Sequence, residues 1–192
     1  MPPFAQRTRN LLLRLFGRRV RKRPPAQAVT DLPEWAQAGK KRRAHVRRMV
    51  VLLNEWADEM DVSPEERRRW LTACWLHDAL RDAELPDGIS HGHAAAELAA
   101  SHGESDRGVL SAVRYHSVGH ARWDDVGKML YLADFLEPGR KSRRKQRAQL
   151  ARRVPRDPDG VLRQILAHQI SSRLRRQRRV DPRTIEFWNS LT

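Results

Sequence analysis

Cysteine, strand-forming patterns and internal repeats are scarce or absent in this 192-residue sequence. The single cysteine, Cys74, cannot form an internal disulfide, and its apolar neighbours indicate a small core residue in a reducing cytoplasm. No run of alternating β-branched residues predicts a strand, whereas long stretches of Ala, Leu, Arg, Glu and Gln favour helix. The sequence therefore argues against a disulfide-stabilised fold and predicts a cytoplasmic, helical protein.

Acidic residues are absent from residues 1–30, although this segment is rich in Arg and Lys. Arg14 interrupts its apolar stretch, which is far shorter than the ~20 residues of a transmembrane helix. The uninterrupted apolar region and small-residue cleavage site of a signal peptide are also lacking. If helical, residues 1–30 form a basic amphipathic extension suited to a membrane surface. A disordered tail that binds nucleic acid is an equal alternative.

The formal net charge of +15 is unevenly distributed. Further basic runs lie at 40–43, 140–156 and 173–179, while the segment 58–125 has more acids than bases. Basic flanks of this kind attract polyanions, namely nucleotides, RNA or an anionic membrane surface. The alternative for any single run is that its arginines only solvate a helix.

Apolar residues at helical spacing predict a succession of helices after residue 31. Ser63, Pro64 and Glu66 form a helix start, with Ser63 as N-cap and Glu66 closing a capping box. We expect helices at about Lys40–Met60, Pro64–Asp78, His91–Ala100, Asp106–His116, Asp124–Leu136, Asp159–Arg179 and after Asp181. The predicted fold is all-α, an orthogonal helical bundle of residues 31–192 that follows the extension of residues 1–30.

Imidazole and carboxylate groups occur in order along these predicted helices. The pair His77-Asp78 ends an apolar helix, where an ionised carboxylate is costly to bury unless a cation or dense hydrogen bonding compensates it. The candidate metal ligands are His45, His77, Asp78, His91, His116 and Asp134. Taken singly, each histidine is more often a surface or core residue, but a helical bundle can bring such a set to one cavity. The ordered set therefore predicts a metal site.

The ligand types restrict the metal and its chemistry. Imidazole with carboxylate suits Fe, Mn or Zn, and argues against Ca²⁺ or a thiolate-bound structural zinc. Neighbouring residues on a helix diverge by about 100°, so His77 and Asp78 can both ligate only at a helix end or with two metals. Such a site activates water and neutralises phosphoryl oxygens. Arg42, Arg81 and Arg140 lie beside the ligand helices and predict a phosphate-bearing substrate.

The order His45, His77-Asp78, Asp134 is similar to that of the HD-domain metal-dependent phosphohydrolase superfamily. Three stretches resemble one family within it, the YqeK-type symmetrical bis(5'-nucleosyl)-tetraphosphatases, which are diadenosine tetraphosphate hydrolases. These stretches are RYHSVG at 114–119, MLYLADFLEPGR at 129–140 and DPRTIEFWN at 181–189. The resemblance runs from about residue 40 to the C-terminus, and it implies a bundle of the HD-domain type.

The resemblance also implies an activity and a division of roles. It implies an iron-dependent enzyme, with manganese as an alternative, that uses one or two ions to split the tetraphosphate bridge into two ADP by metal-hydroxide attack. By position, the essential metal would be held by His45 and by the catalytic residues His77, Asp78 and Asp134. His91 and His116 would complete a second metal position or contact phosphate. The nucleotide site would further contain Arg42, Arg81, Ser117 and Arg140.

Some features depart from the family pattern. Arg81 stands where Lys is usual, Asp181 stands where His is usual, and the extension of residues 1–30 lies outside the pattern. A second hypothesis is therefore the same site acting on another nucleotide or on an RNA end. A third, of a different class, is a basic RNA- or membrane-associated binding protein with a vestigial site. Formation of a homodimer is left open by the sequence.

Overall fold

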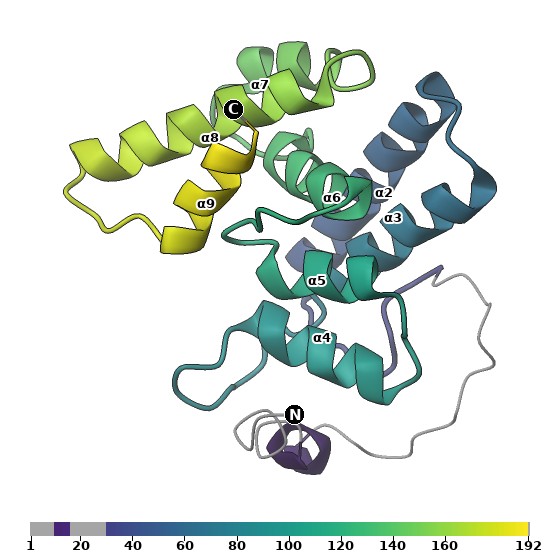
Figure 1. Ribbon diagram of the computed structural model, residues 1–192. Coiled ribbons are helices and arrows are strands. Elements are labelled where there is room, and N and C mark those ends of the chain that lie inside the picture. The colour runs from purple at the N-terminus through teal and green to yellow at the C-terminus, as the bar shows by residue number, and fades with distance from the viewer. Residues whose placement is uncertain (1–9, 16–29, 192) are drawn as a thin grey trace.

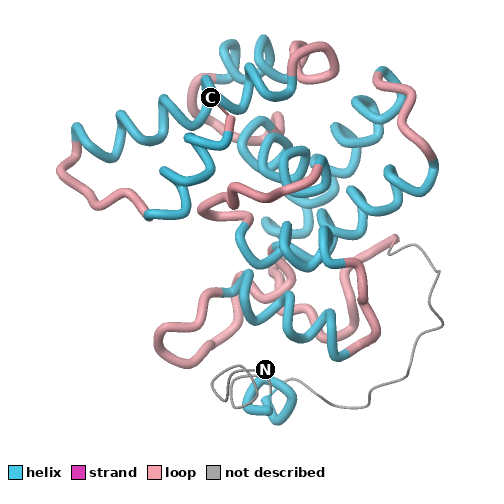
Figure 2. Tube along the Cα trace, viewed as in Figure 1, coloured by secondary structure: helices cyan, strands magenta, loops and turns pink. Residues whose placement is uncertain are grey.

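The computed structural model describes residues 10–15 and 30–191. Within these residues all regular structure is helical, as Figure 2 shows, so the expected all-α bundle is confirmed. Figure 1 shows the arrangement of helices α2 Lys40–Glu59, α3 Pro64–His77, α4 His91–Ser101, α5 Arg107–Tyr115, α6 Asp125–Leu136, α7 Arg144–Ala151, α8 Pro158–Arg175 and α9 Pro182–Ser190.

The start of α3 shows how the sequence sets a helix boundary. The Ser63 hydroxyl accepts a hydrogen bond from the Glu66 N–H at 3.1 Å, and Pro64 occupies the first turn, as expected. The Glu66 side chain, however, does not close the expected capping box, because its carboxylate accepts from the Trp70 indole N–H at 2.8 Å. Trp70 is buried, and a buried indole N–H needs an acceptor more than an exposed helix start does.

Helix α6 lies in the middle of the molecule (Figure 1) and packs against α2, α3, α5, α7 and α8. Most of its residues are apolar and almost completely buried: Val126, Met129, Leu130, Tyr131, Leu132, Ala133 and Leu136. A helix with so much buried apolar surface is held in place by the helices around it. This packing fixes the position of α6, and with it that of Asp134 near its C-terminal end.

The C-terminal half departs from the expected helix pattern in two places. The basic segment 140–156 contains α7, which apolar periodicity did not predict because Leu150 is the single buried residue of this helix. Helix α8 ends at Arg175 rather than at Arg179. Gln177 adopts a left-handed backbone conformation with φ of 52°, which stops the helix.

The predicted N-terminal extension is described only at residues 10–15 and 30. Residues 10–15 are helical, and Leu12 is completely buried in the hydrophobic core, whereas Leu11 and Leu15 are exposed. The rest of residues 1–30 lies outside the described residues, so membrane or nucleic-acid binding by this segment stays a prediction. Within the described part of the chain, no helix is both long and apolar enough to cross a bilayer.

Candidate metal centre

The predicted ligands from α2 through α6 converge at one end of their helices to form two neighbouring groups. Within each group, all the ligand atoms lie within 4.8 Å of one another. The first group contains His45, His77 and Asp134, and the second group contains Asp78, His91 and His116. The structure thus brings together all the residues that the sequence suggested as metal ligands.

The first group has the geometry of a cation site. His45 Nε2 lies 3.1 Å from Asp134 Oδ1, and the rings of His45 and His77 lie 5.8 Å apart. Both histidines are buried, and Nε2 of each makes no aligned hydrogen bond, although the Asp134 carboxylate lies beside that of His45. A buried nitrogen without a partner costs about 1–3 kcal/mol. Coordination of one cation by both nitrogens and the carboxylate would remove this cost, so these residues fit a divalent metal.

Contacts on the far side of each imidazole determine which nitrogen faces the centre. His77 Nδ1 lies 2.7 Å from the Cys74 carbonyl oxygen, and His116 Nδ1 lies 2.8 Å from the Val113 carbonyl oxygen. A carbonyl oxygen can only accept, so each Nδ1 carries the proton and each Nε2 presents a lone pair to the centre. Metal-binding histidines are usually oriented in this way by a backbone or carboxylate acceptor.

The second group is less ready for a cation. Asp78 Oδ1 lies 3.3 Å from His91 Nε2 and 3.7 Å from His116 Nε2, and the two Nε2 atoms are 3.0 Å apart. Arg81 donates to His91 Nδ1 at 3.2 Å, so His91 carries its proton on Nε2 in this structure. A cation at the second group would require His91 to lose or move that proton.

Asp78 lies between the two groups because α3 ends at His77. Asp78 is the C-cap of this helix, with φ of −108° and ψ of 16°, and it leaves the helical path there. Its Oδ2 is 3.6 Å from His77 Nε2 in the first group, while its Oδ1 faces the second group. The helix end therefore allows adjacent residues to serve neighbouring positions, one of the two arrangements that the sequence required.

The electrostatics of the centre keep its carboxylates ionised and one histidine neutral. Burial alone would raise the pKa of Asp78, but the imidazoles around it and Arg42 hold that pKa well below its usual range. The pKa of Asp134 is lowered in the same way, against burial, by His45 and Arg140. Burial and the neighbouring His77 lower the pKa of His116 to about 4. At neutral pH the centre therefore offers anionic oxygens and an uncharged imidazole, which are the forms that bind a cation.

The predicted substrate-binding residues surround this centre. Arg42 donates to Asp78 Oδ2 at 3.1 Å, and Arg140 donates to the Asp134 carboxylate and, at 3.0 Å, to its backbone oxygen. The Ser117 hydroxyl is 3.1 Å from His116 Nε2. A cavity of about 520 Å³ opens here, with Arg42, His45 and Arg140 in its wall. Guanidinium groups that hold the ligand carboxylates could also reach a phosphate in this cavity.

Glu137 is a part of the centre that the sequence did not indicate. It is almost completely buried, and its Oε1 lies 3.2 Å from His45 Nδ1 on the side away from Asp134. Arg48 donates to its Oε2 at 2.6 Å, and burial is outweighed by Arg48 and His45, so the pKa of Glu137 is lowered. The available signal was a lone acid between an apolar helix and a Pro-Gly turn.

Gly92 is a second residue that the sequence did not single out. A Cβ atom at this position would lie 2.7 Å from the Val113 carbonyl oxygen and 3.0 Å from the His116 ring. The absence of a side chain allows α4 to approach α5 closely enough for His91 and His116 to meet.

Comparison with known proteins places the chain in a family. The HD domain model matches residues 42–139, about half of the chain, and this range contains all the residues of both groups. The chain belongs to the HD-domain family and is a metal-dependent phosphohydrolase of that family. The expected superfamily is therefore confirmed.

Two individual relatives refine this placement. The symmetrical bis(5'-nucleosyl)-tetraphosphatase of Staphylococcus aureus (strain NCTC 8325 / PS 47) is 38% identical over 53 residues, which is 27% of this chain and 27% of that protein. The match thus spans about a quarter of the length of that curated relative, and the relationship is distant. The crystal structure of a predicted HD superfamily hydrolase involved in NAD metabolism from Clostridium acetobutylicum superposes with a TM-score of 0.66 at 24% identity, over 80% of this chain and 89% of that chain. This similarity shows a shared fold.

Proposed function

We propose that the chain hydrolyses a dinucleoside tetraphosphate symmetrically, with diadenosine tetraphosphate as substrate and two ADP as products. The observation that carries the proposal is the first group, in which two buried imidazole nitrogens without hydrogen-bond partners face an ionised carboxylate. The partial match to a symmetrical bis(5'-nucleosyl)-tetraphosphatase supports the choice of substrate. Iron is the proposed metal, with manganese as the alternative.

The residues of the centre have separate roles in this proposal. His45, His77 and Asp134 hold the essential cation, and Asp78, beside His77, completes its ligand set. His91 and His116 hold a second cation with Asp78, or they contact phosphate. When bound, the cation supplies the Lewis acidity that activates water and neutralises phosphoryl oxygens. Glu137 orients the His45 ring through Nδ1.

The arginines around the centre bind the phosphate chain. Arg42 comes from α2, Arg81 follows α3 and Arg140 follows α6, so their guanidinium groups approach the centre from different helices. A tetraphosphate bridge is a long anion, and cationic groups from several directions can hold it while its middle bond is cleaved. Ser117 adds a hydroxyl next to His116 for one further phosphate oxygen.

Product analysis of the full-length protein tests this proposal directly. The protein is stripped of metal with a chelator, reloaded under anaerobic conditions with Fe²⁺ or with Mn²⁺, and incubated with diadenosine tetraphosphate. ADP as the sole nucleotide product supports symmetrical cleavage. ATP and AMP in equal amounts would contradict it, and metal-loaded protein without turnover would favour a vestigial site.

A second candidate is the same site acting on another nucleotide or on a phosphorylated RNA end. Asp181, which stands where the family usually has His, accepts from the Arg183 N–H at 2.9 Å and caps α9, so its carboxylate has a structural role here. The family's usual imidazole at this position is therefore replaced by a helix-capping carboxylate. Comparing kcat/KM for diadenosine tetraphosphate, nucleoside triphosphates and a 5'-triphosphate RNA decides between the two substrate classes.

The remaining expectations about partners stay predictions. RNA or anionic membrane contact through residues 1–30, a homodimer and a cytoplasmic location each agree with the sequence. A basic binding protein without activity is the competing hypothesis of a different class. Retention of RNA with steep salt dependence and without hydrolysis would support that hypothesis.

A further inference from the structure

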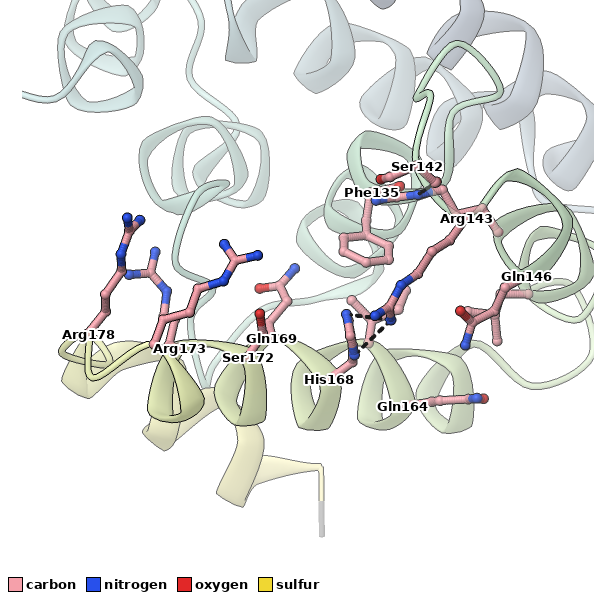
Figure 3. A pocket seen from close by; sticks show the side chains of 14 residues that line it. Phe135, Ser142, Arg143, Gln146, Gln164, His168, Gln169, Ser172, Arg173 and Arg178 are labelled. Atoms are coloured by element: carbon pink, nitrogen blue, oxygen red, sulfur yellow. Dashed lines mark hydrogen bonds between the residues drawn. The ribbon is translucent and has the colours of Figure 1, made fainter.

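A second cavity, of about 690 Å³, lies between α7 and α8 at the C-terminal end of α6 (Figure 3), and we call it the α7–α8 pocket. Its wall contains several arginines from α7, α8 and the segments next to them: Arg143, Arg147, Arg173, Arg176 and Arg178. Asp and Glu are absent from the residues that line it. Its volume is within the range of small-molecule sites, about 300–1,000 Å³.

The arginines of this pocket differ from most of those near the metal centre. Among the described residues, no carboxylate lies within 4 Å of any arginine of the pocket wall. Arg143 instead donates to His168 Nε2 at 2.9 Å (Figure 3). Arg173 donates to the Arg179 backbone oxygen at 3.3 Å. Positive charges gathered without counter-charges repel one another, and a bound anion would relieve that repulsion.

Two local features show that the cationic wall is maintained at a cost. Arg143 adopts a left-handed conformation with φ of 53°, which is strained for a residue with a side chain, and from there its guanidinium reaches across to α8. Burial and the nearby Arg143 lower the pKa of His168, so this imidazole stays uncharged and accepts from Arg143. Strained backbone of this kind is found at functional sites, and here it lies in the wall of a cavity.

The rest of the wall suits the nucleoside part of a ligand. Phe135, Leu150 and Ile165 provide an apolar surface, and the Arg147 guanidinium lies 4.1 Å from the centre of the Phe135 ring. The Gln146 side-chain amide can donate to and accept from the edge of a base, and the amide groups of Gln164 and Gln169 can donate, since their oxygens already accept from Arg153 and Tyr131. Phosphates near arginines together with a base near amides and apolar carbons describe a nucleotide.

The pocket is also adjacent to the metal centre. Phe135 in its wall follows the ligand Asp134 directly on α6. Arg147 donates to the Phe135 backbone oxygen, and the charges of Arg140 and Asp134 both act on its pKa, the first lowering it and the second raising it. A substrate with a nucleoside at each end of a tetraphosphate needs two places for its two halves, one on each side of the cleaved bond.

We propose that the α7–α8 pocket binds one nucleoside diphosphate half of the substrate, with Arg143 and Arg173 on its phosphates. This inference rests on the proposed function for the identity of the substrate. Arg147 has a structural role through its bonds to the Phe135 and Ser142 backbone oxygens, so it is not used as a test position. The charge-matched controls are Arg144 and Arg152, which are exposed on α7 and at its C-terminal end and do not line the pocket.

The first measurement is ADP binding by calorimetry, with a chelator present, so that neither metal nor turnover is needed. Arg143→Ala and Arg173→Ala are each expected to weaken ADP binding about tenfold, as for the loss of a charged hydrogen bond, and the Arg144→Ala and Arg152→Ala controls less than about twofold. Equal weakening of ADP binding in all four variants would show that the effect comes from net charge alone, and it would overturn the proposal. Displacement of ADP by single-stranded RNA at lower concentration than by diadenosine tetraphosphate would assign the pocket to RNA and also overturn it.

The second measurement is the steady-state kinetics of the iron- or manganese-loaded protein with diadenosine tetraphosphate. Arg143→Ala and Arg173→Ala are expected to raise KM about tenfold while kcat stays within about twofold. The reason is that the lost contact is equally strong in the enzyme–substrate complex and in the transition state. Weaker ADP binding with an unchanged KM would overturn the placement of the substrate half here. If the wild type shows no turnover, the proposed function fails, while the ADP measurement still tests the pocket.

Discussion

The metal centre and the α7–α8 pocket both gather charged side chains, but only the centre contains both signs. In the centre, Arg42 and Arg140 each donate to a ligand carboxylate. In the pocket, Arg143 and Arg173 donate to an uncharged ring and a backbone oxygen. The charges of the centre are therefore close to balanced, and its buried imidazole nitrogens fit a cation. The pocket has an excess of positive charge that only an anion from outside can balance.

The largest expected effect is on activity. It follows from removing one carboxylate of the metal centre while the α7–α8 pocket is left unchanged. Asp78→Asn keeps the shape of the side chain but removes the charge that faces both ligand groups. We expect kcat to fall on the order of 10³-fold or more and metal content to decrease, because the cation provides most of the activation. ADP binding to the α7–α8 pocket should not change. The matched control is Asp87→Asn at an exposed position.

A smaller effect, on metal affinity, is expected when the acidic residue that contacts His45 is changed. Glu137→Gln keeps the volume at a buried position but weakens the acceptor for His45 Nδ1. We expect metal affinity to fall about 10–100-fold, as for other changes behind a metal ligand. Titration of the metal-free protein with Mn²⁺ measures this, and Glu97→Gln, which removes the partner of Arg114, is the control. An unchanged metal affinity would mean that Glu137 acts only as the ion-pair partner of Arg48.

The stability of the metal-free protein should depend on pH through the centre. Because the pKa of His116 is lowered from 6.5 to about 4, the unfolded chain binds a proton between these pH values that the folded protein does not. The free energy of unfolding should therefore fall as pH falls from about 6.5 to 4, by on the order of 2 kcal/mol. Below that range, protonation of Asp78 and Asp134 removes further stability, because their folded pKa values are lowered. Urea unfolding at several pH values measures this, and His116→Gln should flatten the upper part of the profile.

The smallest expected effect concerns the strain in the pocket. Arg143→Gly suits the left-handed backbone and removes one uncompensated charge, so we expect the free energy of unfolding to rise by about 1 kcal/mol while ADP binding weakens. Gln177→Gly is the matched control, because Gln177 has a φ of 52° and does not line the pocket. It should raise stability without a change in ADP binding. A loss of stability in Arg143→Gly would show that its contact with His168 outweighs the strain.

The sequence singled out the residues that the structure brings together in the two groups, because each is a chemically distinctive residue at the end or on the inner face of a periodic helix. Glu137 was missed because its burial depends on Arg48, which lies 89 residues away in the sequence. The helix α7 was missed because it buries little apolar surface. The pocket could not be predicted, since whether an arginine has a counter-charge depends on distant acids. Arg69, for example, pairs with Asp106 and Asp124, which are 37 and 55 residues away.

The packing of α6 against α2, α3, α5, α7 and α8 has a consequence for the choice of substrate. Asp134 and Phe135 are consecutive residues on this helix, one in the metal centre and the other in the pocket wall. Because tightly packed neighbours leave α6 little freedom to slide or rotate, the separation of the two sites is fixed. If the chain has the proposed function, this fixed separation determines which length of phosphate chain reaches from the pocket to the cation. Dinucleosides with three or five phosphates would then place a different bond, or none, at the cation.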